Sequence, residues 1–196
     1  MEHISPAPFS LDFNLMTGMC DSGKEKATDR FVSNMIAQFH DREAAQRIID
    51  DGDDKLYSFY ELDYIPEIGS DLRFGTSIVY PGKVGDEYYM TKGHFHTLLE
   101  TAEVYYCLAG EGYMLMETPE GDINLQELKP GVALYVPPRW AHRSINTGKE
   151  NMVTFFVFRS DAGHDYGTIE QKGYRKILID KDGVPTLIDN PRWTKG

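Results

Sequence analysis

The sequence predicts an all-β protein whose short antiparallel strands form a sandwich or barrel. Many short segments are rich in β-branched and aromatic residues, turn pairs such as Pro81-Gly82 and Pro130-Gly131 separate them, and no helical pattern long enough for a parallel crossover lies between them. The length of 196 residues suits a single domain. The predicted strands are Leu56–Leu62, Leu72–Tyr80, Tyr88–Thr91, Val104–Leu108, Tyr113–Glu117, Ile123–Leu128, Ala133–Val136, Arg143–Asn146, Met152–Phe158, Lys176–Ile179 and Thr186–Ile188.

Residues 1–54 differ in pattern from the rest of the chain. Apolar side chains between Thr28 and Asp50 recur at helical spacing, with a break near His40, and the turn signal of residues 51–54 ends this pattern. We therefore expect residues 1–54 to form a short helical extension that packs on the barrel or on a second subunit, and residues 55–196 to form the barrel. The apolar residues that set the spacing in the first half are Phe31, Met35, Ile36 and Phe39.

Charge and composition exclude several classes of partner. The formal net charge of −11 argues against nucleic acid or an anionic membrane, because such partners require a basic face. No stretch approaches the roughly 18 apolar residues of a membrane span. Cys20 and Cys107 have neither metal nor redox spacing, and the first residues lack the basic start and apolar run of a secretory signal. We expect a cytoplasmic protein that binds neither nucleic acid nor membrane.

Three histidines and one carboxylate form the most informative pattern. His94 and His96 are two positions apart, so on a strand both rings project to one face. Taken alone, such histidines are more often hydrogen-bonded core or surface residues than ligands. Glu103 opens an apolar run, where an unpaired carboxylate is costly to bury unless it meets a cation, and His142 follows a strand and a tight turn. Together these ligand types suit iron, nickel, manganese or zinc and leave open positions on a six-coordinate ion.

Two segments around these residues resemble the conserved motifs of the cupin superfamily, a small double-sheet antiparallel barrel of the jelly-roll kind. The first runs from Glu103 to Gly110, and the second is Gly131-x5-Pro137-x4-His142-x3-Asn146. Two features depart from the pattern. Six residues separate His96 from Glu103 where cupins commonly have three or four, and Arg139 stands where the second motif usually has glycine.

Longer strings resemble one branch of the cupins, the archaeal-type glucose-6-phosphate isomerases. The similarity covers most of the barrel, from about residue 55 to Trp193, and matches residues 1–54 much less distinctly. The strings that carry it are Pro81–His96, Thr101–Tyr105, Val136–His142, Asp161–Gly167 and Asn190–Trp193.

The resemblance implies a role for each candidate residue. One divalent ion per subunit, with iron first and nickel, manganese or zinc as alternatives, is bound by His94, His96, Glu103 and His142. The sugar phosphate contacts Ser77, Thr91, Gly93, Tyr105 and Tyr166, with the phosphate itself against Thr91 and Gly93. Glu103, His164 and Tyr166 are the catalytic candidates. His164 can assist ring opening or shuttle a proton, since an ordinary histidine has a pKa near 6.5.

The implied reaction interconverts glucose 6-phosphate and fructose 6-phosphate, either through a cis-enediolate with Glu103 as the base or through a metal-assisted hydride shift. The resemblance also implies a homodimer. Many members of the family carry tyrosine at the position of Phe158, so a role for that hydroxyl does not transfer to this chain. Two alternatives stay open: another metal cupin, such as a dioxygenase or an isomerase of a different sugar phosphate, and a non-catalytic sugar-binding cupin.

Overall fold

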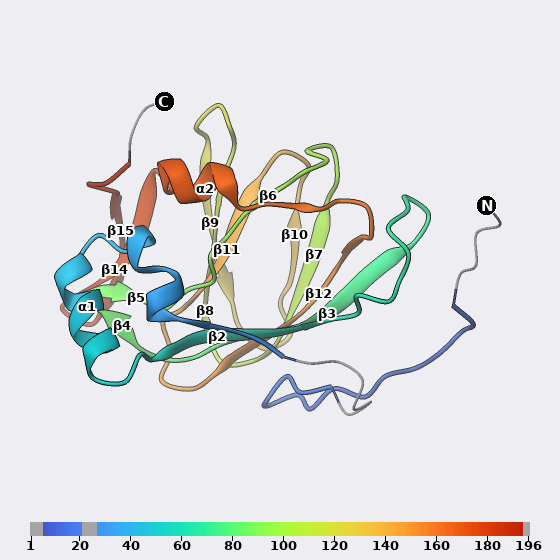
Figure 1. Ribbon diagram of the computed structural model, residues 1–196, viewed down its shortest axis with the longest axis horizontal. Coiled ribbons are helices and arrows are strands. Elements are labelled where there is room, and N and C mark those ends of the chain that lie inside the picture. Colours follow the sequence, from blue (N-terminus) through green and yellow to red (C-terminus); the bar gives the residue numbers. More distant parts are fainter. Residues whose placement is uncertain (1–5, 21–26, 194–196) are drawn as a thin grey trace.

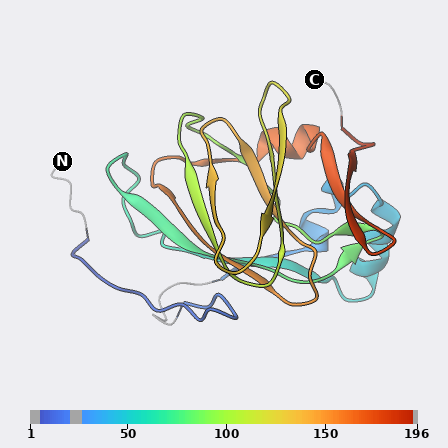
Figure 2. The ribbon, with the colours of Figure 1, turned by 180° about the vertical axis from the view of Figure 1, so that it is seen from behind.

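The computed structural model describes residues 6–20 and 27–193 and confirms a mostly β chain with antiparallel sheets. A six-stranded sheet and a three-stranded sheet lie on either side of a shared apolar core, as the two views of the ribbon show (Figures 1 and 2). The larger sheet has the order β1 (Thr28–Phe31), β2 (Lys55–Glu61), β3 (Leu72–Val79), β12 (Met152–Arg159), β7 (Glu103–Ala109) and β10 (Ala133–Val136). The smaller sheet has the order β11 (Ala141–Asn146), β8 (Gly112–Glu117) and β9 (Ile123–Leu128).

Two further sheets and a few helical turns close one end and one side of the barrel. The short strand β6 (Phe95–His96) pairs with β13 (His164–Asp165). The fourth sheet has the order β15 (Val184–Asp189), β14 (Lys176–Lys181), β5 (Glu87–Tyr88) and β4 (Lys83–Val84). The helices are α1 (Arg42–Asp50), α2 (Gly167–Lys172) and the two 3-10 turns η1 (Val32–Asn34) and η2 (Ile36–Gln38). In Figure 1, α1 lies beside the fourth sheet and α2 lies across the top of the barrel.

The predicted strands after residue 55 all have counterparts, and one of them is shorter than expected. Tyr88–Thr91 was expected as a strand, but regular pairing ends at Tyr88 and Met90 forms only an isolated bridge with Ile145. The missed strands β1, β4, β6 and β13 have two to four residues each, which is too short for an alternating pattern to be visible.

The expected helix from Thr28 is wrong in its first half, where the chain forms β1, η1 and η2 before α1 begins. Consecutive 3-10 turns repeat every three residues, so they produce the apolar spacing that resembles a helix. Asp41 caps α1, since its Oδ1 accepts a hydrogen bond from the N–H of Ala44 at 2.8 Å. Residues 1–5 and 21–26 of the expected extension lie outside the described residues. Within the part that is described, no helix is long and apolar enough to cross a membrane.

The alternation along β7 orients the functional side of the barrel. Glu103, Tyr105 and Cys107 are buried, whereas Val104 and Tyr106 are exposed on the outer face. A period of two therefore directs Glu103 into the barrel interior. The candidate site is built around this carboxylate.

Candidate metal centre

The four predicted ligands, His94, His96, Glu103 and His142, converge in the barrel interior and are here called the ligand cluster. All four are buried, and each offers one donor atom, with these atoms within 4.8 Å of one another. Backbone pairing produces this convergence. The N–H of His142 donates to the carbonyl of His94 at 3.1 Å, which joins the start of β11 to the segment before β6, and Glu103 opens β7 opposite them.

Hydrogen bonds on the far side of two rings fix their orientation. Nδ1 of His96 lies 2.7 Å from Oγ1 of Thr101, and Nδ1 of His142 lies 3.3 Å from the carbonyl of Trp140. With the proton on Nδ1, the lone pair of Nε2 is free to bind a metal. In both rings Nε2 lies near the carboxylate of Glu103, at 3.1 Å for His96 and 3.0 Å for His142. Such outer contacts are typical of metal-binding histidines.

The protonation states also fit a divalent ion. Burial and the neighbouring His142 hold the pKa of His94 well below its usual value, so its ring is neutral, and Nε2 of His94 has no hydrogen-bond partner among the described residues. Burial by itself would raise the pKa of Glu103, but the adjacent imidazoles outweigh burial and lower it below its usual range. Three imidazoles and one ionised carboxylate that converge on a common point form a suitable donor set.

The two departures from the cupin motifs are accommodated locally. The long interval between His96 and Glu103 forms a turn in which Thr101 donates through its N–H and its hydroxyl to the carbonyl of Leu98. This turn supplies the Thr101 hydroxyl that contacts His96. Arg139 has a φ of +74°, a left-handed conformation that glycine adopts easily, so the backbone of the usual motif is kept without the usual residue.

A single cavity brings most of the predicted site residues together. It is lined by part of the ligand cluster, by residues of β2, β3, β7, β11 and β12, and by the loop after β12. His96 is absent from the lining but is buried directly behind it. The predicted residues on the cavity wall are Ser77, Thr91, Gly93, His94, Glu103, Tyr105, His142, His164 and Tyr166.

Residues 91–93, here called the phosphate turn after the role expected of Thr91 and Gly93, lie along one wall of this cavity. Oγ1 of Thr91 accepts a hydrogen bond from the N–H of Ser144 at 3.0 Å, and the N–H of Thr91 donates to the carbonyl of Ser144 at 2.9 Å. Gly93 has a φ of +74°, and a Cβ there would lie 2.5 Å from Oη of Tyr174. Only glycine therefore fits both the backbone and the packing of this turn.

The loop with His164 and Tyr166 covers the ligand cluster. β13 pairs His164 with His96, and the His164 ring lies 4.4 Å from that of His94, centroid to centroid. Burial lowers the pKa of His164 to about 4, so the expectation of an ordinary value near 6.5 is wrong and the ring is neutral at neutral pH. Asp165 fixes the loop, since its Oδ2 accepts the hydroxyl proton of Thr168 at 2.7 Å.

Sequence reasoning did not identify five further residues on the cavity wall. Three of them, Tyr57, Phe59 and Glu61, alternate along β2 and share one face, a signal that a period-two analysis of Leu56–Leu62 contains. Burial raises the pKa of Glu61, and Arg73, with Nη1 3.4 Å from Oε1 of Glu61, opposes this effect. The other two, Ser144 and Phe156, belong to strands that were predicted, but no motif marks them.

Comparisons with known proteins bear on this geometry. The family model described as Glucose-6-phosphate isomerase (GPI) matches residues 29–193. The chain is similar to a protein of Thermococcus litoralis named glucose-6-phosphate isomerase, at 43% identity over 95% of this chain and 96% of that protein. Proteins of the same name from Pyrococcus furiosus and Sinorhizobium medicae are 43% and 35% identical, and the matches cover 96% of this chain in both cases and 98% and 88% of those proteins. A structure from a study of oxalate oxidase has a TM-score of 0.48 and 14% identity over 58% of this chain and 56% of that chain, a likeness too weak to carry an argument.

Proposed function

This chain belongs to the glucose-6-phosphate isomerase family, and from that premise we propose that it interconverts glucose 6-phosphate and fructose 6-phosphate. The observation that carries the proposal is the position of the ligand cluster at one wall of the cavity and the phosphate turn at another. A sugar phosphate has its carbonyl at one end and its phosphate at the other. The carbonyl would face the ligand cluster while the phosphate contacts the phosphate turn.

The ligand cluster would hold one divalent ion, and we propose iron first, with nickel, manganese or zinc as alternatives, on the chemistry of the donor set. When bound, such an ion polarises a carbonyl and stabilises the negative charge that develops on its oxygen. The order of preference among these metals rests on the family resemblance. The oxygen-free imidazole donors and the single carboxylate support a transition metal over calcium or magnesium.

The residues of the chain have distinct roles in the proposed reaction. Glu103, ionised and buried, takes the proton from C2 and returns it to C1, with a hydride shift as the alternative route. His164 is neutral and so is able to accept a proton during ring opening, while Tyr105 and Tyr166 orient the sugar. The phosphate lies against Thr91 and Gly93, whose hydroxyl and N–H are suitable donors, with Ser77 nearby.

The decisive experiment measures conversion of fructose 6-phosphate to glucose 6-phosphate by the purified protein after loading with each metal. We expect turnover that exhaustive chelation abolishes and that added metal restores. A chelated protein that keeps its full activity would falsify the metal-dependent proposal. Oxygen uptake without isomerisation would instead indicate a cupin dioxygenase.

We also propose that the chain forms a homodimer in the cytoplasm. Val104, Tyr106 and Tyr135 are 38%, 42% and 59% exposed and lie together on the outer face of β7 and β10, since Tyr135 pairs with Val104 across the two strands. Clustered apolar side chains of this kind mark association surfaces. Cys107 is a buried free thiol, which supports a reducing compartment. Light scattering should give twice the chain mass, and Tyr135→Glu should reduce it to one chain, whereas Val184→Glu, at another exposed apolar position, should not.

A further inference from the structure

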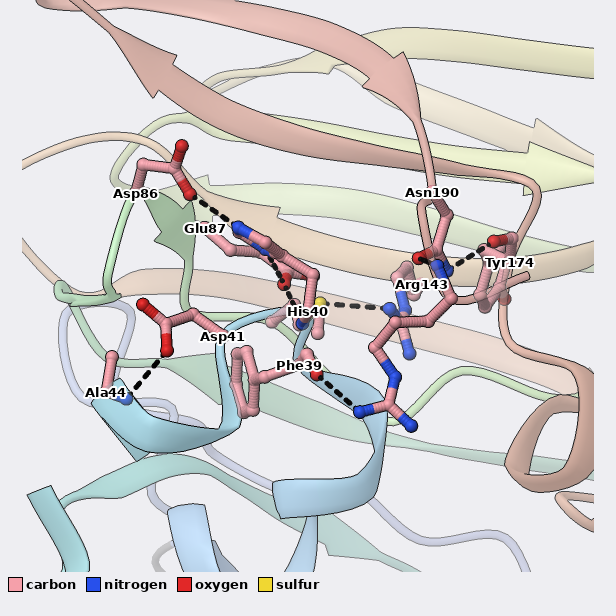
Figure 3. Close-up of polar contacts among 11 residues, drawn as sticks. Phe39, His40, Asp41, Ala44, Asp86, Glu87, Arg143, Tyr174 and Asn190 are labelled. Carbon is pink, nitrogen blue, oxygen red and sulfur yellow. Dashed lines mark hydrogen bonds and ion pairs between the residues drawn. The ribbon is translucent and has the colours of Figure 1, made fainter. Parts of the chain in front are cut away.

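Arg143 is a buried cation directly behind the phosphate turn. It follows the ligand His142 in β11 and is only 3% exposed. Its Nη2 donates to the carbonyl of Lys92 and to Oε1 of Gln38, and its Nη1 lies 2.9 Å from the sulfur of Met90. Figure 3 shows the guanidinium beside Tyr174, whose ring centroid is 4.4 Å from Cζ.

The charge of Arg143 is uncompensated by any contacting acid. Over residues 6–20 and 27–193 no carboxylate lies within ion-pair distance of its guanidinium, and its Nε has no hydrogen-bond partner. Arg73 and Arg159, in contrast, each pair with an acidic side chain. Burial lowers the pKa of Arg143, but a guanidinium stays protonated under physiological conditions. The buried carboxylates of Glu87 and Glu117 stabilise this charge only from beyond ion-pair distance, so a bound anion would add to a partial compensation.

The cavity itself offers an anion only neutral donors. None of the described residues on its wall is lysine or arginine. Lys92 belongs to the phosphate turn, but its ammonium group is paired with Glu170 on α2, which compensates its charge. The positive charge available to a phosphate against Thr91 and Gly93 therefore comes from outside the wall, from Arg143 behind the turn and from Arg30 beside Tyr57, in a chain whose formal net charge is −11.

The peptide between Lys92 and Gly93 links Arg143 to the cavity. Its carbonyl accepts a hydrogen bond from Arg143, and Gly93 lines the cavity. A cation on the carbonyl polarises the peptide and makes its N–H a stronger donor. The contact is also steric, because a Cβ on Gly93 would lie 2.5 Å from Oη of Tyr174 and 3.0 Å from Cβ of Arg143. Arg143 and Tyr174 together form the surface on which the phosphate turn rests.

We infer that Arg143 is the positioning residue of an anion site, holding the phosphate turn in place and supplying the positive charge that this turn presents to a substrate phosphate. The inference rests on the proposed function only in that the anion is the phosphate of a sugar phosphate. Arg143 acts through the Lys92–Gly93 peptide and does not contact the reacting carbons.

The test measures binding of inorganic phosphate to the metal-loaded protein by calorimetry, in wild type, Arg143→Met and Arg143→Lys. Arg143→Met should weaken phosphate binding by about 10-fold or more, because a full charge near the anion is lost. Arg143→Lys, which keeps the charge, should stay within about threefold of wild type. In the isomerase assay the Met variant should raise KM by a similar factor while kcat changes by less than about threefold. Arg175→Met is the matched control, since Arg175 also contacts backbone carbonyls and an aromatic ring, but its carbonyl partners are Thr118 and Pro119 instead of the phosphate turn.

Three outcomes would overturn the inference. The first is unchanged phosphate affinity in a folded, metal-retaining Arg143→Met protein, and the second is no phosphate binding by wild type. The third is a folded Arg143→Lys variant that binds phosphate about 10-fold or more weakly than wild type, which decides the matter even if Arg143→Met does not fold. Because these measurements do not require turnover, Arg143-dependent phosphate binding in a protein without isomerase activity would support the anion site and reject the proposed function.

Discussion

His94 in the ligand cluster and His40 beside the β4–β5 hairpin are both histidines close to carboxylates, but their ring nitrogens have different partners. Nε2 of His40 lies 3.0 Å from Asp86, and its Nδ1 lies 3.0 Å from Glu87, as Figure 3 shows. Nε2 of His94 has no such partner within the described part of the chain. Their pKa values move in opposite directions, since the hydrogen bond to Glu87 raises that of His40 and burial lowers that of His94.

The difference separates a histidine with structural partners from one that we propose binds a metal. His40, Asp86 and Glu87, here called the N-terminal junction, use their polar atoms to hold the segment before α1 against the fourth sheet. The ligand cluster leaves lone pairs directed at a common point, which costs stability unless a ligand occupies it. Substitutions in the ligand cluster should therefore mainly lower the catalytic rate, and those in the N-terminal junction should mainly lower the stability of the fold.

Glu103→Gln should have the largest effect on activity. If Glu103 transfers the proton, kcat should fall by about 10² or more, the usual cost of removing a general base. Metal content measured on the same sample separates loss of the base from loss of the ion. Glu127→Gln, at an exposed carboxylate paired with Lys129, is the matched control. A Glu103→Gln enzyme within about threefold of wild type would exclude Glu103 as the proton carrier.

Gly93→Ala tests how much the backbone conformation and the packing of the phosphate turn contribute to stability. We expect a loss of about 2–5 kcal/mol in the free energy of unfolding, because left-handed strain and a steric clash add together. Gly131→Ala is the control for strain alone, since Gly131 has a φ of +92° and no atom within 4 Å of an added Cβ. Equal losses in urea denaturation of the two variants would show that packing on Tyr174 is unimportant.

Thr91→Val should affect binding more than chemistry. The substitution keeps the shape of the side chain but removes a hydroxyl proposed to contact the phosphate, so KM should rise about 10-fold with kcat nearly unchanged. Steady-state kinetics with fructose 6-phosphate check this. Thr186→Val, in the β14–β15 hairpin, removes a hydroxyl far from the cavity wall and should leave both constants unaltered. A fall in kcat alone would place Thr91 with the reacting carbons instead.

His40→Gln should have the smallest effect, on stability and only at lower pH. The folded-state pKa of His40 is raised above the ordinary histidine value of 6.5, so its ion pairs stabilise the fold fully below that pH and are lost as the pH rises through the folded-state pKa. The variant should be less stable by about 1–2 kcal/mol near pH 6, and the difference should shrink toward pH 9. Thermal unfolding across this range measures it, with Lys149→Gln as an exposed control. A difference that grows with pH contradicts the assigned sign.

The strands and the ligand set were predictable for one reason, which is that both depend on short-range spacing. Ile123–Leu128 and Ala133–Val136 match β9 and β10 because turn residues bound them on each side. His94 and His96 share a face through the period of a strand, and Glu103 was marked by its place at the start of an apolar run.

The rest depends on contacts between distant residues, and spacing does not encode these. The 3-10 turns before α1 resembled a helix because their apolar residues also recur every three to four positions. The pKa of His164 follows from burial beneath a loop, which no local pattern reveals. Arg143 was read only as part of a strand, and its relation to the phosphate turn appears only when β11 and residues 91–93 lie side by side.

The pairing of β13 with β6 connects the loop that covers the cavity to the strand that carries one candidate metal ligand. β6 carries the ligand His96, and within the described structure β13 is its ladder partner, with His164 opposite His96. A movement of the β13 loop away from the cavity would break this short ladder and thereby loosen the strand that anchors one imidazole. In the proposed metal-dependent isomerase, departure of the product and escape of the ion would share a mechanical barrier, so a change that speeds the first should also shorten the residence time of the second.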